Sequence, residues 1–355
     1  MKKSLIALAV AGAVAAPAAF AATSNVDVYG IFGASVDIYD RDNAQDDEFR
    51  VSSTASRIGF KGAEDLGGGL SAIWQVETGL DIDTNGGTWG SRNTFVGLSS
   101  KSLGTVRLGN YDTAYKMSSG RYDVFADTMG DYNTIMGSLN NDNGRYDVRE
   151  QNSISYESPD MSGLKVMGTF GQRNEDGVNP DGSLWSLAAV YANGPLSVIA
   201  AYESQKDSPI APFGSSDIAD SKAWKLGAGY AFGNTRVAGV YERISADDWF
   251  GSDFDRDAWY LSVAHTMGNI TLKGAYANAD ETDFSAGSAD DSADFWVIGV
   301  DYALSKRTVA YALYSSLDND SNANYRIGGN GTTGAFNSGF GGDPSGLSIG
   351  IKHSF

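Results

Sequence analysis

Polar and apolar side chains alternate along most of the chain, and this alternation is the strongest structural signal in the sequence. It is clearest over residues 26–38, 70–81, 224–232, 296–304 and 347–355. A period of two predicts β-strands that carry one apolar and one polar face. Each segment has about ten residues or more, which suits a tilted strand that crosses a lipid bilayer.

The expected connections between these strands fall into two classes that alternate along the chain. Short turns occur, for example, at 65–69, 100–103 and 193–195. The long and mostly acidic loops are expected at 41–52, 82–90, 111–147, 173–182, 205–220, 246–253, 280–292 and 318–344. Tight turns on one side and long loops on the other are typical of transmembrane barrels. In hydrocarbon every backbone polar group has to be paired within the protein, so a spanning sheet must close.

We therefore expect an all-β protein, namely a transmembrane antiparallel β-barrel with short periplasmic turns and long external loops. Seven short turns and eight long loops join sixteen strands, and an even number places both termini on the periplasmic side. The alternative is a large soluble β-sandwich or β-helix. It is disfavoured because it needs a second apolar layer that these strands do not supply.

The N-terminus has the features of an export signal. Two lysines precede an apolar stretch at 5–16, and Ala19 and Ala21 supply the small side chains that a signal peptidase requires. We expect residues 1–21 to be a signal peptide and residues 22–355 to form the barrel domain. The expected location is the outer membrane of a Gram-negative bacterium.

Charge and composition exclude several kinds of function. The formal net charge is −18 and the chain has no cysteine. Strong acidity argues against nucleic acid as a partner, and without cysteine there is no disulfide, zinc–thiolate site or Cys nucleophile. His265 and His353 are the two histidines, and neither has the spacing of a Ser–His couple. We therefore expect no enzymatic activity, no cofactor and no metal site.

The polar face of the strands contains several charged residues. By the parity of the alternation, Arg57, Lys61, Glu77, Arg107 and Arg149 lie opposite the apolar side chains. A charge facing lipid costs about 2–4 kcal/mol near the bilayer midplane, so these residues are expected to line the lumen. Rings of charge at a water-filled constriction set which ions pass easily.

Six segments and the terminal Phe355 carry a resemblance to a known family. The segments are 56–62 (SRIGFKG), 64–70 (EDLGGGL), 95–99 (FVGLS), 104–109 (GTVRLG), 152–159 (NSISYESP) and 302–308 (YALSKRT). With them the chain resembles the general Gram-negative porins, especially the trimeric neisserial and β-proteobacterial type. The resemblance implies a homotrimer of sixteen-stranded barrels, with the third external loop folded into the lumen. It also implies recognition of the C-terminal aromatic residue by the outer-membrane barrel assembly machinery.

The resemblance also implies particular residues at the constriction. Loop 111–147 is the expected constriction loop, and Arg57, Arg92 and Arg149 fall where wall arginines line the narrowest part. The acids expected on the opposite side are Asp112, Asp123, Asp127 and Asp131. The facing of Arg92 is ambiguous, because Phe95 and Val96 cannot both face lipid without a bulge.

The expected function is general diffusion of ions and small hydrophilic solutes, with outer-membrane lipid and lipopolysaccharide around the barrel. The net charge of the vestibules attracts cations, whereas the wall arginines favour anions at the narrowest point. From the net charge we expect a preference for cations. A substrate-specific channel, a lipid-hydrolysing barrel and a non-conducting structural or adhesion barrel are the alternatives. Conductance and its saturation by a solute would separate them.

Overall fold

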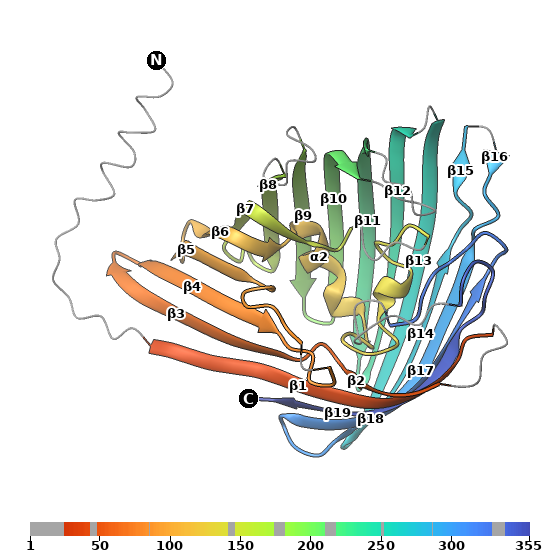
Figure 1. Cartoon of the computed structure of the whole chain (residues 1–355). Helices are drawn as coiled ribbons and strands as arrows, with labels where there is room; N and C mark the ends of the chain where they lie inside the picture. The colour runs from red at the N-terminus through yellow and green to blue at the C-terminus, as the bar shows by residue number, and fades with distance from the viewer. Residues whose placement is uncertain are drawn as a thin grey trace.

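The computed structural model describes residues 25–42, 48–84, 86–140, 146–173, 182–209, 218–249, 252–285, 287–328 and 338–355. The expected signal peptide, residues 1–21, lies outside these ranges. Within the described ranges, no helix has both the length and the apolar character needed to cross a membrane. The regular structure is almost entirely β-strand (Figure 1).

The strands are β1 (Asn25–Asp40), β2 (Glu48–Ser53), β3 (Arg57–Gly67), β4 (Leu70–Gly79), β5 (Thr94–Ser100), β6 (Gly104–Asp112), β7 (Arg149–Glu157), β8 (Leu164–Gln172), β9 (Ser183–Asn193), β10 (Leu196–Pro209), β11 (Ile218–Phe232), β12 (Thr235–Trp249), β13 (Ser252–Met267), β14 (Ile270–Ala279), β15 (Asp283–Phe284), β16 (Gly287–Ser288), β17 (Ala293–Ala303), β18 (Thr308–Asn319) and β19 (Ser345–Ser354). The helical elements are α2 (Ala114–Ser119), η1 (Gly120–Tyr122) and η2 (Tyr132–Thr134). All three helical elements lie in the connection between β6 and β7.

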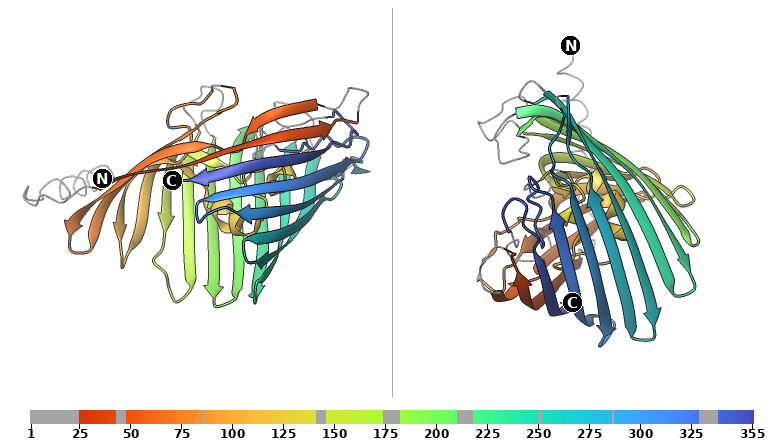
Figure 2. Two further views of the ribbon diagram at one scale, coloured as in Figure 1. Left: turned by 90° about the horizontal axis from the view of Figure 1, so that it is seen from below. Right: turned by 90° about the vertical axis from the view of Figure 1, so that its right-hand side faces the viewer.

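The strands form one antiparallel sheet that closes on itself (Figures 1 and 2). The closing pair is β1 with β19, in a register that runs from Ile31 opposite Ser354 to Asp40 opposite Ser345. Strands β2 and β3 both pair with β1 and are two parts of one interrupted strand. With these two counted as one, and the small β15–β16 hairpin set aside, the barrel has sixteen strands. The predicted fold class and strand number are confirmed.

Two details of the strands differ from the sequence prediction. The chain between β2 and β3 leaves the strand at Ala55, whose φ is +47°. There the Ser56 hydroxyl accepts a hydrogen bond from the Gly33 amide at 3.0 Å. Strands β2, β10 and β12 also occupy parts of the segments 41–52, 205–220 and 246–253, which the alternation predicts as loops. Beyond the membrane both faces of a strand are wet, so the strand continues by backbone pairing while the alternation that would reveal it disappears.

The outer face of the barrel has a repeated motif of paired aromatic side chains. In four successive hairpins, a Trp on the first strand packs diagonally against a Tyr on the second, with ring centroids 4.9–5.4 Å apart. The pairs are Trp185–Tyr202, Trp224–Tyr241, Trp259–Tyr276 and Trp296–Tyr314. Amphipathic rings at one height mark a membrane–water interface. We refer to these four pairs as the aromatic girdle, and they identify β9 to β18 as a lipid-facing sector.

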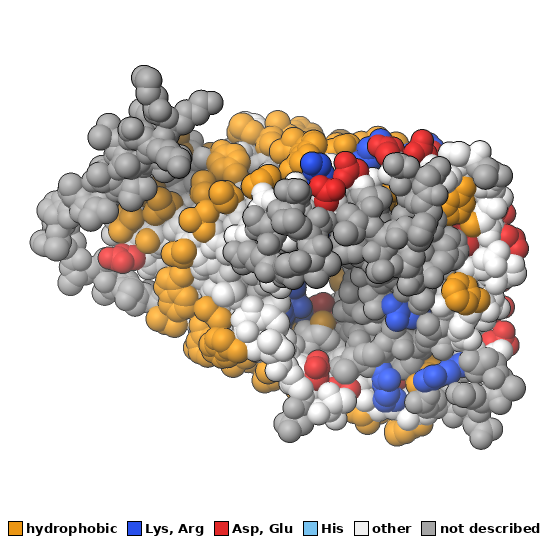
Figure 3. Space-filling view, turned by 45° about the horizontal axis from the view of Figure 1, so that its top comes forward, with side chains coloured by type: hydrophobic (Ala, Val, Ile, Leu, Met, Phe, Trp, Pro, Cys, Tyr) orange, Lys and Arg blue, Asp and Glu red, His pale blue; other side chains and the backbone are white. Residues whose placement is uncertain are grey.

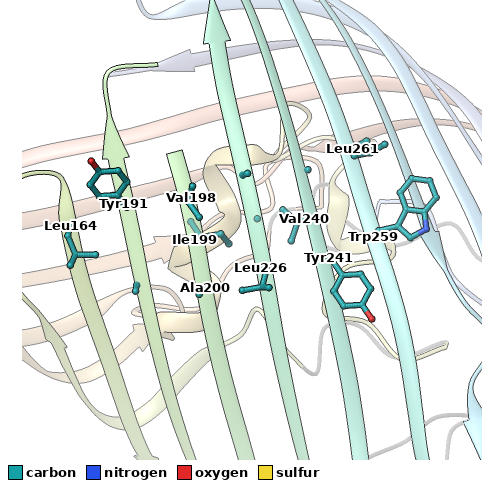
Figure 4. Close-up of a pocket in the computed structure, with 14 residues that line it drawn as sticks. Leu164, Tyr191, Val198, Ile199, Ala200, Leu226, Val240, Tyr241, Trp259 and Leu261 are labelled. Atoms are coloured by element: carbon teal, nitrogen blue, oxygen red, sulfur yellow. The ribbon is translucent and has the colours of Figure 1, made fainter. Parts of the chain in front are cut away.

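Between the girdle and the short turns the outer face is hollowed across β8 to β13 (Figure 4). The depression holds about 700 Å³, and its floor includes Ala189, Ala200, Ala228 and Gly239. Apolar side chains such as Leu226, which is 52% exposed, surround this floor. The depression opens toward lipid, so the pore has to be sought on the other side of the sheet.

A cluster of buried hydrophobic residues lies inside the barrel, where the β6–β7 connection packs against the inner wall (yellow in Figure 1). Four of its apolar side chains, Tyr115, Phe125, Met129 and Ile135, are fully buried. Glycines on the inner wall leave space for the side chains of this connection. A Cβ at position 229 would lie 2.8 Å from the ring of Tyr122. The expectation that the third loop folds into the lumen is confirmed.

Candidate functional site

The loop between β6 and β7, hereafter the inner loop, begins with a capped helical turn held against the wall. The hydroxyl of Thr113 accepts the Lys116 amide at 3.3 Å, which caps α2. The Ala114 amide donates to Thr169 on β8 at 3.1 Å, and the Tyr115 amide donates to Ser186 on β9 at 2.8 Å. The free amides of the first turn are therefore paired with wall hydroxyls.

Buried charges fix the middle of the inner loop to strands β11 to β13. The ammonium group of Lys225 contacts the Asp147 carboxylate, and both side chains are almost fully buried. Glu242 pairs with Arg256 at 3.2 Å and accepts hydrogen bonds from the Tyr115 hydroxyl at 2.9 Å and the Gly137 amide at 2.7 Å. A buried charge that loses its partner is strongly unfavourable, so these contacts hold the inner loop in one position.

The tip of the inner loop reaches the first and last strands of the barrel. Asp127, whose φ is +62°, lies 3.1 Å from Arg57 on β3 and 3.8 Å from Lys352 on β19. Burial alone would raise the pKa of Asp127, but Arg57, Lys352 and Arg92 outweigh it and hold that pKa below its usual value. Asp127 is therefore a charged link between the loop tip and the wall.

Arg92 lies on the wall beside this link. Its Nε atom is 2.6 Å from Glu77 on β4, and the other carboxylate oxygen of Glu77 accepts the Tyr29 hydroxyl at 2.9 Å. The ambiguity at Phe95 and Val96 is resolved. Val96 is 59% exposed on the outer face, and Phe95 points inward beneath the Arg107 guanidinium.

Arg149 lies in a third group on the same wall. Its NH2 atom is 3.0 Å from Asp112, and Asp112 is also 3.6 Å from Lys116. Asn93 donates to Asp112 at 2.8 Å and accepts from Arg149 Nε at 2.8 Å. Asp112 thus lies on the arginine wall, which differs from its expected place on the opposite side. Its register explains this, because Asp112 is the last residue of β6 and pairs directly with Arg149.

Two other predicted acids, Asp123 and Asp131, are buried within the inner loop, so they do not form the lumen surface opposite the arginines as expected. Asp123 accepts backbone amides of Phe125 and Tyr132 and lies 3.3 Å from the Tyr260 hydroxyl. Burial raises the pKa of Asp123 well above its usual value, and the neighbouring Asp131 adds to the shift. Burial likewise raises the pKa of Asp131 to about 6. Their carboxylates cap local turns, a role that the composition of the loop did not reveal.

The remaining predicted residues lie away from the loop tip. Lys61 is exposed, 5.1 Å from the centre of the Tyr29 ring. Arg107 pairs with Glu157 at 3.2 Å, only a few residues from the short turn that precedes β6. Phe355 exchanges backbone hydrogen bonds with Gly30 at the barrel seam. A pore-lining role for Lys61 and Arg107 and an assembly role for Phe355 stay predictions.

Three residues at the site were missed by sequence reasoning: Asn93, Lys116 and Lys352. Lys352 stands on the polar face of the last strand, so the parity rule applied to the other strands would have placed it in the lumen. Lys116 and Asn93 lie outside the strands, where parity gives no information.

Five ion pairs follow the wall from the base of the inner loop, at Asp112, to its tip, at Asp127, and we call their members the constriction charges. The cations are Arg57, Arg92, Lys116, Arg149 and Lys352, and the acids are Glu77, Asp112 and Asp127. Five cations against three acids leave a surplus of two positive charges. Figure 3 looks toward the long-loop end, where basic and acidic side chains surround a hollow.

A closed transmembrane barrel, narrowed by an inward loop and lined with charge, defines the class of outer-membrane diffusion channels. The family model for Gram-negative porin matches residues 7–343. The chain belongs to the Gram-negative porin family. It is therefore a channel protein of the outer membrane that passes small hydrophilic solutes by diffusion, and not an enzyme.

Individual relatives agree with this assignment. The outer membrane porin protein 32 of Delftia acidovorans is 31% identical over 372 residues, which cover all of both chains. An outer membrane porin protein of Bordetella pertussis is 30% identical over 71% of each chain. Among solved structures, the anion-selective porin from Comamonas acidovorans has a TM-score of 0.79 at 27% identity, covering 94% of this chain and all of that one.

Proposed function

We propose that this porin prefers anions and that the constriction charges set this preference. The observation that carries the proposal is the surplus of two positive charges among the constriction charges. Ions meet the strongest field where the water-filled path is narrowest, so local charge outweighs the net charge of −18 carried by the whole chain. The proposal thus replaces the cation preference that net charge alone suggested.

The sharing of acids among the cations supports this proposal. Asp112 is shared by Lys116 and Arg149, and Asp127 is shared by Arg57 and Lys352. Each shared carboxylate neutralises one cation and leaves the other available to a passing anion. The similar porin from Comamonas acidovorans is described as anion-selective, which supports the proposed anion preference.

The proposed assembly is a homotrimer surrounded by outer-membrane lipid and lipopolysaccharide. The girdle pairs lie on β9 to β18, whereas Val28 on β1 and Val96 on β5 are outward aliphatic side chains that are more than half exposed. An apolar part of the outer face that lies outside the Trp–Tyr girdle suits contact with another copy of the chain. We also propose that Phe355 serves as the recognition residue for the barrel assembly machinery.

The anion preference is tested by single-channel conductance in salts of matched concentration. Replacing potassium by the less mobile lithium should lower the conductance slightly, while replacing chloride by acetate should lower it strongly. The opposite ranking would contradict the proposal. Conductance that rises linearly with salt concentration fits a general channel, whereas saturation would favour a substrate-specific one.

A further inference from the structure

A second group of positive charges lies away from the constriction, where the inner loop approaches the short-turn end of the barrel. Arg121 belongs to η1 of the inner loop, and Arg236 is the second residue of β12. Both line one pocket of about 270 Å³, whose wall also contains Ser197, Tyr122 and Pro195. A water molecule occupies about 30 Å³ in the liquid, so the pocket can hold a small hydrated ion.

The two arginines differ from most other arginines of the barrel because neither pairs with a carboxylate among the described residues. Arginines that form an ion pair with a carboxylate are Arg57, Arg92, Arg107, Arg149, Arg173, Arg243 and Arg256. Within the part of the chain that the structure describes, neither Arg121 nor Arg236 has an ion pair or a side-chain hydrogen bond. No acidic residue is among the described residues that line their pocket. The nearest acid in sequence, Asp123, is occupied by the Tyr260 hydroxyl and by loop amides.

Arg236 and Arg121 both reach the aqueous interior. On β12 the alternate positions Ala238 and Val240 are buried toward the inner loop, and Arg236 shares their parity. Tyr122 also lines the pocket, and its hydroxyl is buried without a hydrogen-bond partner among the described residues. A guanidinium group presents five N–H donors in a fork that matches carboxylate and phosphate oxygens.

We propose that Arg121 and Arg236 form a binding site for small oxyanions, of the phosphate or carboxylate type, at the periplasmic exit of the channel. The two guanidinium groups bind the anion from the inner loop and from the wall. Because exposed charge pairs are weak, the dissociation constant is on the order of 1 mM. Such binding is brief enough to release the anion while raising its local concentration beyond the constriction.

The site is tested with inorganic phosphate as the probe and the purified full-length mature channel in detergent. The ³¹P linewidth of phosphate, followed during titration with protein, reports exchange with a bound state and gives a dissociation constant. The double variant Arg121→Gln/Arg236→Gln should weaken binding about tenfold, the size expected from losing charge-assisted hydrogen bonds. The matched control is Arg307→Gln, which changes an exposed arginine in the β17–β18 turn and should leave binding unchanged.

A constriction variant separates this site from the proposed selectivity mechanism. Arg92→Gln should leave phosphate binding at the exit within about twofold of the wild type. Binding that is lost in Arg92→Gln but kept in the double variant would overturn the exit site and assign the anion to the constriction. Absence of broadening in the wild type would overturn it too. A wild-type channel that prefers potassium would refute the proposed anion preference while leaving the phosphate result intact.

Discussion

Lys116 and Lys352 allow the constriction charge to be changed with little structural disturbance. Each shares its acid with an arginine, so replacing both lysines by Gln leaves Asp112 paired with Arg149 and Asp127 paired with Arg57. Both lysines are partly exposed, at 32% and 27% of the side chain. The double variant therefore removes the surplus of two positive charges and keeps the tip of the inner loop attached to the wall.

The size of the effect follows from Coulomb's law. An ion passing about 8 Å from a unit charge in water gains or loses about 0.5 kcal/mol, and screening in 0.1 M salt roughly halves this energy. Anion and cation shift in opposite directions, so each lysine changes the chloride-to-potassium permeability ratio about twofold. The pair should lower this ratio four- to fivefold, or roughly twofold for each lysine.

The assay is the reversal potential of variant channels across a potassium chloride gradient. A matched control is Lys101→Gln/Lys306→Gln, which removes two lysines from short turns outside the constriction and should leave the ratio close to that of the wild type. An unchanged ratio in Lys116→Gln/Lys352→Gln, or an equal fall in the control, would refute the assignment of selectivity to the constriction charges.

Three further predictions concern the inner loop and the outer face. Arg256→Met leaves the buried Glu242 with one cation fewer and should destabilise the barrel by about 3–5 kcal/mol, measured by urea unfolding. It should also increase the noise of the open channel. Arg256→Lys should restore part of the stability and part of the quiet open state. Burial raises the folded-state pKa of Asp131 to about 6, so folding stability should fall as pH rises from about 4 to 6, by roughly 2–3 kcal/mol. Asp131→Asn should reduce that fall in urea melts, and the remaining fall belongs to Asp123, whose pKa is also raised by burial. A fall of undiminished size would assign it to other groups. Val96→Arg should shift trimers to monomers on native gels. Ile298, beneath the girdle, is similarly exposed, and Ile298→Arg should lower the stability of the barrel by about 2–4 kcal/mol without dissociating the trimers. Dissociation by both variants would contradict the proposed subunit face.

The sequence was most informative where one physical constraint governs each residue. Lipid on one side of the sheet and water on the other produce the alternation, so strand number, turn side and the lumen-facing parity of Arg57 and Arg149 could all be predicted. The same rule fails once both faces are wet, so the alternation predicts loops where β10 and β12 continue as strands. Ala55 interrupts a strand through local backbone geometry that alternation does not report.

The length of the inner loop identifies it as the constriction loop, but the sequence does not distinguish the roles of its acidic residues. Its acids look alike in sequence, yet Asp127 contacts two wall cations while Asp123 and Asp131 are buried as caps of turns. The difference depends on how the loop packs against distant strands, for example on the contact of Asp147 with Lys225, which is 78 residues away. Contacts of such separation leave no local pattern.

The central claim is that local charge at the inner-loop tip, and not the net charge of the chain, determines which ions pass. The most direct measurement is the reversal potential of the wild-type channel in a planar bilayer with a potassium chloride gradient. The constriction charges predict a potential whose sign shows that chloride is the more permeant ion. A potential of the opposite sign, with potassium more permeant, would contradict the claim.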